Sequence, residues 1–231
     1  MAWLSRIFAG WCCDQPTPRV RGTIRSATRK ARTGHVFHSH RGPCRPPCHV
    51  FEDDTRKGPK GKNPWIELDG EPIGDSEIII QHLGQRFGVD IDTGLTARDA
   101  AIAHVWRRTF EEHFHQVFEW ELLVHPEGAA FMKAFVRSQL PPILGNVAFT
   151  MMHRGMAKQL HARGIARHTH DVIAAKGRHD IDALSAFLGD RSFLVADHPV
   201  TADAAVFGQL APMMVWPMGT PVAQYLRGVG N

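Results

Sequence analysis

Residues 62–83 constrain the fold more than any other stretch of this chain. Trp65 to Leu68 alternates apolar and polar side chains, as a half-buried strand does. Asp69-Gly70 is typical of a two-residue hairpin turn, and Glu71-Pro72-Ile73 is a short return strand. Asp75-Ser76 then offers a helix N-cap ahead of apolar residues at helical spacing. The sequence therefore predicts a strand, a hairpin, a second strand and a helix in fewer than thirty residues.

From Thr96 onward nearly all of the chain has the periodicity of amphipathic helices. Helices are expected over residues 98–124, from Glu127 to the Pro141-Pro142 pair, and over 143–163, 169–188 and 202–210. An apolar stripe on the first of these helices is expected to be core and comprises Trp106, Phe110, Phe114 and Phe118.

Two features are expected near the end of the chain. Phe193-Leu194-Val195 is predicted to be a short extended piece, and Pro212 and Pro217 are predicted to break the chain after the last helix. The fold class is then a small α/β unit joined to an all-helical unit.

The charge is distributed very unevenly. The whole chain carries a net +4, but residues 1–51 hold eight arginines and one lysine against a single acid, Asp14, which gives +8. The remaining 180 residues carry −4, so the basic balance does not predict a nucleic-acid partner for the organised part. No apolar run reaches the roughly 18 residues that a membrane span needs, and no membrane partner is predicted.

The first fifty residues show neither a sustained helical period nor strand alternation, and four interpretations compete. They are a cleavable Arg-rich targeting peptide, a secretory signal, a metal site, and the product of an altered reading frame in a GC-rich gene. The frame-shift hypothesis is favoured. The metal site is disfavoured because Cys-x3-Cys with scattered histidines matches no zinc spacing, so no metal is predicted. Its candidate ligands are His35, His38, His40, Cys44, Cys48 and His49.

Residues 62–83, read from Lys62-Asn63-Pro64-Trp65 to His82-Leu83, resemble the second half of a glutathione-transferase N-terminal domain. That family has a proline opening the third strand and an acidic-Ser pair opening the next helix. Further along, Gly164 to His168, Asp180 to Asp190 and Phe193 to Gly208 resemble the metaxin-like, failed-axon-connections-like branch of the same superfamily. The resemblance covers about residues 51–220.

The resemblance implies a thioredoxin-like N-terminal domain followed by an all-helical C-terminal domain. Residues 1–50 are expected to be an atypical, poorly ordered segment, so that the first β-α-β part is atypical or missing. Residues 51–90 would be the remnant of the thioredoxin-like domain, and 95–231 the helical domain, which is expected to lack the family's closing helix.

The resemblance also assigns binding residues. Asn63 and Pro64 would bind the cysteinyl part of glutathione through the backbone, and Asp75 and Ser76 would bind its γ-glutamyl end. The alternative is that Pro64 shapes a turn and that Asp75 and Ser76 cap a helix.

Three further residues have expected roles. Arg167 and His168 are candidates for a pocket between the domains, and the alternative is that they cap a helix end or pair on the surface. Asp203 resembles the family's buried helix-start aspartate, which has a role in folding. Val200 stands where a Ser or Thr would complete its capping box, although Thr201 offers a partial substitute.

No Ser, Tyr or Cys that would stabilise the glutathione thiolate is recognisable. Ser26, Ser39, Cys12 and Cys13 sit at no identifiable strand-to-helix turn, and the one tyrosine, Tyr225, is far away. We therefore expect this chain to bind glutathione weakly or not at all, whereas the intact family form would conjugate it to small electrophiles. A non-enzymatic interaction module is the alternative function.

The expected partners are glutathione as co-substrate, a small electrophile and a second copy of the chain in a homodimer. All four cysteines lie at or before Cys48, so the organised part suits a reducing compartment, and the cytoplasm is predicted. A mitochondrial location is the alternative if the Arg-rich start is a targeting segment.

Overall fold

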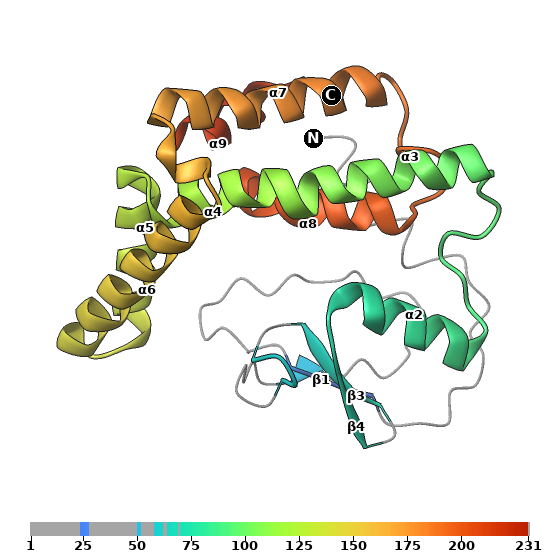
Figure 1. Ribbon diagram of the computed structural model, residues 1–231, viewed down its shortest axis with the longest axis horizontal. Coiled ribbons are helices and arrows are strands. Elements are labelled where there is room, and N and C mark those ends of the chain that lie inside the picture. The colour runs from blue at the N-terminus through green and yellow to red at the C-terminus, as the bar shows by residue number, and fades with distance from the viewer. Residues whose placement is uncertain (1–23, 28–49, 52–57, 62–63, 69, 231) are drawn as a thin grey trace. The chain divides into compact units, whose positions relative to one another are not determined.

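The computed structural model describes residues 24–27, 50–51, 58–61, 64–68 and 70–230. The chain divides between Thr93 and Gly94 into two compact units. The first is an α/β unit, and the second, from Gly94 on, is helical throughout its described regular elements (Figure 1).

The α/β unit contains a four-stranded sheet in the order β2-β1-β3-β4. β1 (Ile24–Ala27) pairs in parallel with β2 (Val50–Phe51) and antiparallel with β3 (Trp65–Leu68). β3 pairs antiparallel with the edge strand β4 (Glu71–Gly74). One parallel pair extended by an antiparallel hairpin is the arrangement of a thioredoxin-like domain, which confirms the predicted fold class.

The predicted hairpin and helix are confirmed. Leu68 pairs with Glu71 across a two-residue turn, and Gly70 has a φ of 89°, which suits glycine in a tight hairpin. α2 (Ser76–Phe87) follows directly and ends at Gly88, which is in the left-handed conformation. Three apolar side chains form the small core between sheet and helix and are buried: Ile66, Leu68 and Ile79.

The structure differs from expectation within the first fifty residues. Ile24–Ala27 form β1, in a segment whose sequence shows no strand alternation. The backbone of β1 is paired on both sides, by β2 and by β3, so the strand is defined by its neighbours rather than by its own pattern. The candidate metal ligands His35, His38, His40, Cys44, Cys48 and His49 all lie outside the described residues.

The helical unit is built from α-helices joined by short turns. In chain order its elements are α3 (Ala97–Arg108), η2 (Thr109–Phe114), α4 (His115–Leu123), α5 (Pro126–Gln139), α6 (Pro142–Ala162), η3 (Ile165–Arg167), α7 (His170–Leu188), α8 (Thr201–Val215) and α9 (Pro221–Gly228). α5 and α6 form a helical hairpin whose turn contains Pro141, as the proline pair predicts (Figure 1).

α3, η2 and α4 form one continuous helix, and its central part, η2, is a π-helix. Phe110 and Phe114 are completely buried, while Trp106 and Phe118 pack against the core from its edge. The apolar stripe predicted for this helix is therefore core, as expected.

The prediction that Pro212 ends the last helix is wrong. α8 continues through Pro212 to Val215, although proline removes one helical hydrogen bond. The buried side chains of Leu210 and Met213 flank the proline, so burial on both sides holds the helix together. α9, which the sequence analysis did not predict, follows after Pro217. Residues 193–195 form bends and no strand.

α9 is attached to the core by a buried acid. The carboxylate of Glu121, in α4, accepts hydrogen bonds from the backbone N–H of Val222 at 3.1 and 3.2 Å and of Ala223 at 3.3 Å. Glu121 is fully buried, and burial raises the pKa of its carboxyl group. The first-turn N–H groups of α9 thus receive an acceptor from a residue about one hundred positions earlier in the chain.

Candidate functional site

The β3–β4 register brings the two predicted halves of the site together. Trp65 pairs with Gly74, so the residues just outside this pair, Pro64 and Asp75, are opposite each other. The N–H of Asp75 donates a hydrogen bond to the carbonyl of Pro64 at 3.2 Å. Pro64, Asp75 and Ser76 therefore lie at one end of the hairpin, where the sheet meets the first turn of α2.

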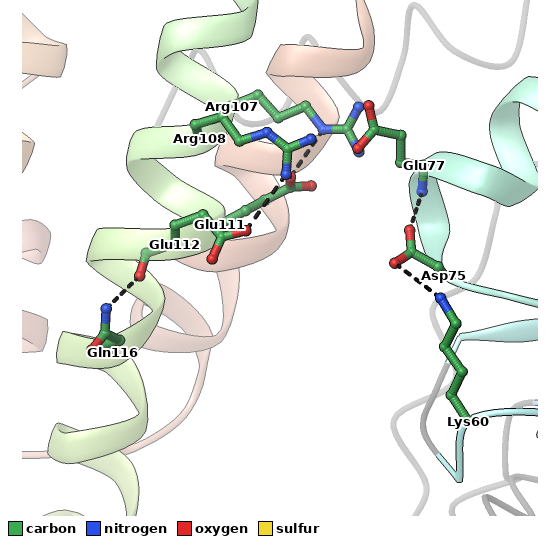
Figure 2. A network of polar contacts seen from close by, with 8 residues as sticks. All are labelled: Lys60, Asp75, Glu77, Arg107, Arg108, Glu111, Glu112 and Gln116. Atoms are coloured by element: carbon green, nitrogen blue, oxygen red, sulfur yellow. Dashed lines mark hydrogen bonds and ion pairs between the residues drawn. The ribbon is translucent and has the colours of Figure 1, made fainter. Parts of the chain in front are cut away.

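Asp75 is held in an unusual backbone conformation. With a φ of 87° and a ψ of 124°, it is the one non-glycine residue with a positive φ in the described part of the chain. Its side chain caps α2 by accepting the N–H of Glu77 at 3.0 Å, and Lys60 Nζ lies 3.9 Å from its other carboxylate oxygen (Figure 2). A strained residue of this kind persists where surrounding structure holds it, and such residues concentrate at functional sites.

Ser76 is exposed and begins α2. Its hydroxyl forms no hydrogen bond within the residues that the structure describes, and the adjacent first-turn N–H groups point out of the helix end. A hydroxyl beside the positive end of a helix dipole is suited to an anionic group such as a carboxylate. The Asp75 carboxylate, nearly half exposed, is suited to an ammonium group next to it.

One buried donor at this end of the hairpin has no acceptor. Trp65 Nε1, directly after Pro64, is buried and has no hydrogen-bond partner among the described residues. Buried N–H groups are normally paired, so an unpaired one needs an explanation. A polar ligand at this end of the hairpin fits the Ser76 hydroxyl and the first-turn N–H groups of α2.

The remaining predicted residues of this site are placed as follows. Asn63 lies outside the described residues, as do Cys12, Cys13 and Ser39. Ser26 is inside β1, opposite Val50 and Ile66, and not at a turn.

Tyr225, the single tyrosine, is on α9 in the helical unit. Its hydroxyl donates to Asp182, and this hydrogen bond raises the pKa of the phenol.

His168 and Arg167 have different surroundings. His168 lines a cavity of about 300 Å³ in the helical unit, together with residues of η2, α4 and α7. Arg167 is not among the residues that line it, and its Nε donates to the carbonyl of His161 at 3.0 Å. The sequence analysis missed four polar residues of this cavity: His113, Gln116, Arg163 and Lys176. They are up to 63 positions apart, so no local motif identifies them.

Asp203 is fully buried near the start of α8. Its carboxylate accepts the N–H of Leu194 at 2.9 Å and the N–H of Val200 at 2.9 Å. The Asp203 half of the capping box is thus intact, whereas Val200 has no hydroxyl, and the N–H of Asp203 bonds the Val200 carbonyl at 3.1 Å instead. These contacts hold the loop before α8, as a folding residue would.

No group of three or more His, Cys, Asp or Glu side chains among the described residues is arranged to hold a metal ion. None of the helices described has both the length and the apolar character to cross a membrane.

Comparison with known proteins gives two matches to protein-family models. Residues 44–128 match the glutathione S-transferase N-terminal domain, and residues 177–231 match the glutathione S-transferase C-terminal domain. No solved structure matches.

Two curated proteins are similar to the chain. An isoprene-epoxide glutathione S-transferase of Rhodococcus is 31% identical over 66% of this chain and 65% of its own length. Failed axon connections of Drosophila melanogaster is 28% identical over 67% of this chain and 39% of its own length. The chain thus spans less than two thirds of the length of either relative. The thioredoxin-like sheet and both family models agree, and the chain belongs to the glutathione S-transferase superfamily.

Proposed function

We propose that this protein binds glutathione at the end of the β3–β4 hairpin and conjugates it to small electrophiles, with weak affinity for glutathione. The observation that carries the proposal is the junction of Pro64, Asp75 and Ser76, where a free hydroxyl, a helix N-terminus and an exposed carboxylate converge. These three groups suit the two charges of a γ-glutamyl end.

Each residue of the site has a separate task. The Ser76 hydroxyl and the first-turn N–H groups of α2 bind the α-carboxylate, and the Asp75 carboxylate binds the neighbouring ammonium. The backbone of Asn63, next to Pro64, pairs with the cysteinyl residue. Lys60 lies 3.9 Å from Asp75 in an exposed pair, which costs little to rearrange when an ammonium arrives.

The proposed electrophile is a small epoxide, because the Rhodococcus relative is named as an isoprene-epoxide transferase. The conjugation forms a bond between the glutathione sulfur and an epoxide carbon and breaks that carbon's bond to oxygen. The thiol proton goes to the resulting alkoxide, so the reaction needs no oxidant, reductant or further co-reactant. The protein's task is to hold the thiol near the epoxide in its more reactive thiolate form.

We propose weak binding because neither candidate side chain is assigned as the hydrogen-bond donor that stabilises the glutathione thiolate. Ser26 lies inside β1 rather than at a strand-to-helix turn, and the hydroxyl of Tyr225 already donates to Asp182, so we assign neither as the donor to the sulfur. Without that hydrogen bond, the affinity rests on the γ-glutamyl contacts and the backbone at Asn63. A dissociation constant of about 1 mM corresponds to about 4 kcal/mol, which a few exposed polar contacts can supply.

A non-enzymatic interaction module is the second candidate function. The similarity to Failed axon connections and the unpositioned thiolate partner favour it. In this case the chain keeps the transferase fold without turnover. A homodimer in the cytoplasm is proposed for either function, on the family resemblance and on the confinement of all cysteines to the first 48 residues.

Product analysis separates the two functions. The full chain is incubated with glutathione and isoprene epoxide, and the adduct is quantified by mass spectrometry against a reaction without protein. We expect adduct formation above the uncatalysed rate, at least tenfold slower in Ser76→Ala and unchanged in Ser138→Ala, a matched serine on α5. Adduct formation at the uncatalysed rate would contradict the transferase proposal and favour the interaction module.

A further inference from the structure

The cavity of the helical unit is lined by an unusual set of side chains. Its volume is about 300 Å³, enough for a small organic molecule, and four basic residues line it: His113, Arg163, His168 and Lys176. No acidic residue is part of the lining. The bases come from four different segments, namely η2, the turn after α6, the end of η3 and α7. The fold therefore gathers two cationic side chains, Arg163 and Lys176, and two imidazoles around one opening.

Two of the four bases are paired with acids that are not among the residues lining the cavity. Arg163 Nη1 donates to Glu119 Oε2 at 2.8 Å, and His113 Nδ1 lies 2.7 Å from Asp180 Oδ2. Glu119 also lies 3.3 Å from His115 Nε2, and its hydrogen bond raises the pKa of His115. These contacts fix the orientation of the Arg163 guanidinium and leave most of its five donors unused.

Neither of these acids is among the residues that line the cavity. Burial raises the pKa of Asp180 against the opposing effect of its hydrogen bond with His113. Glu119 is shared between Arg163 and the His115 imidazole. The titratable groups that line the opening are therefore basic, and both carboxylates are engaged with neighbouring bases.

The other two bases have no partner of their own. In the described part of the chain, Lys176 and His168 form no hydrogen bond and no ion pair. Lys176 is half-buried on α7, so its ammonium group is partly desolvated while it faces the cavity. Lys176 is attracted by the Asp180 carboxylate without forming an ion pair with it, so its ammonium donors remain available to an anionic ligand.

The remaining lining is suited to a small molecule with an apolar body. Ile165 is buried and supplies an apolar surface, and Gly164 adds no side chain to the opening. Gln116 Nε2 donates to the carbonyl of Glu112 at 2.8 Å, which fixes the amide and leaves its oxygen as an acceptor (Figure 2). Charge at one end and apolar contact beside it match a carboxylate on a short hydrocarbon or aromatic body.

We propose that this cavity, lined by His113, Arg163, His168 and Lys176, is a binding site for a small organic monocarboxylate. Lys176 and His168 bind the carboxylate, Arg163 contributes donors from the side, and Ile165 contacts the apolar body. The proposal concerns the helical unit alone and does not depend on glutathione binding at Ser76.

The test is a titration of the full chain with benzoate, followed by amide chemical shifts. Benzamide is the neutral control, because it has the same shape without the charge. We expect saturable shifts at Gly164, Ile165 and Lys176 with benzoate, and at least tenfold weaker binding of benzamide. Equal binding of the two compounds, shifts that do not saturate, or shifts confined to residues outside the cavity would overturn the proposal.

Substitutions test the role of charge. Lys176→Gln is expected to weaken benzoate binding about threefold to tenfold, the range for a partly exposed charged hydrogen bond. Lys133→Gln removes the same charge from the exposed side of α5 and is expected to leave binding unchanged. The melting temperature of each variant shows that it is folded. Equal binding by the two variants would contradict the site.

Ser76→Ala distinguishes the two proposals. Its benzoate affinity is expected to equal that of the unaltered chain, whatever its effect on glutathione. A loss of benzoate binding in Ser76→Ala would contradict a site formed by the helical unit alone.

Discussion

The backbone N–H of Asp75 donates to the carbonyl of Pro64 at 3.2 Å and thereby closes the β3–β4 hairpin against the start of α2. This contact places a residue with a φ of 87° next to the first turn of a helix. The strained backbone and the capping carboxylate belong to the same residue, so two different substitutions of Asp75 can separate their effects on stability.

Asp75→Ala is expected to lower the free energy of unfolding of the α/β unit by about 1 kcal/mol, because it loses the N-cap and keeps the strain. Asp75→Gly loses the same carboxylate but removes the strain at positive φ, so it should be more stable than Asp75→Ala. Hydrogen exchange of the α2 amides measures both. An Asp75→Gly variant less stable than Asp75→Ala would show that the conformation carries no strain.

Asp203 provides a second test. Asp203→Ala leaves the buried N–H groups of Leu194 and Val200 without their acceptor. It should lower the free energy of unfolding, measured with urea, by about 3 kcal/mol. Asp203→Asn keeps one acceptor oxygen and should lose roughly half as much. If both variants unfold at the urea concentration of the unaltered protein, the loop before α8 does not depend on this carboxylate.

Local signals explain which parts of the fold the sequence predicts well. The Asp69-Gly70 turn and the Asp75 cap each act within a few residues, and each is found where it was expected. Pro212 predicts a helix end that does not occur. The burial of Leu210 and Met213 outweighs the helical hydrogen bond that proline removes, and this burial depends on residues elsewhere in the chain.

Other features have no local signal at all. β1 is identified only by its backbone pairing with β2 and β3. The π-helix η2 has the sequence pattern of an ordinary α-helix. The bases of the helical cavity come from four segments and meet through helix packing. The acidic-Ser pair of the proposed glutathione site is contiguous in sequence, so it could be selected as a candidate from the sequence.

The buried carboxyl group of Glu121 makes the free energy of unfolding depend on pH. Burial raises the pKa of this carboxyl in the folded state above its ordinary value of 4.5, so the folded state binds the proton more tightly than the unfolded state. The stabilisation is fully present below pH 4.5 and is lost as the pH rises through the folded pKa.

Glu121→Gln cannot ionise, so its stability relative to the unaltered protein should improve as the pH rises from 4 to 7. Urea unfolding at both pH values measures the difference. A constant difference between the two proteins across this range would contradict a raised pKa for Glu121.

Two glycines in the helical unit form a matched pair. A Cβ at Gly128 would lie 1.8 Å from the carbonyl oxygen of Glu121, where α5 begins close to the end of α4. Gly128→Ala should therefore destabilise the protein by about 3 kcal/mol or more.

Gly155, inside α6, has no atom within 4 Å of its Cβ position. Gly155→Ala should stabilise the helix by about 0.5 to 1 kcal/mol through propensity. Thermal unfolding of both variants checks the pair. A Gly128→Ala variant as stable as Gly155→Ala would rule out the close approach of α4 and α5.

Glutathione binding at the Pro64–Asp75–Ser76 junction is tested most directly by calorimetric titration of glutathione into the full chain. We predict saturable binding with a dissociation constant of about 1 mM, weakened at least fivefold in Ser76→Ala and unchanged in Ser138→Ala. Equal affinities in Ser76→Ala and Ser138→Ala would contradict the assigned site. A micromolar dissociation constant would contradict the prediction that the chain lacks a positioned partner for the sulfur.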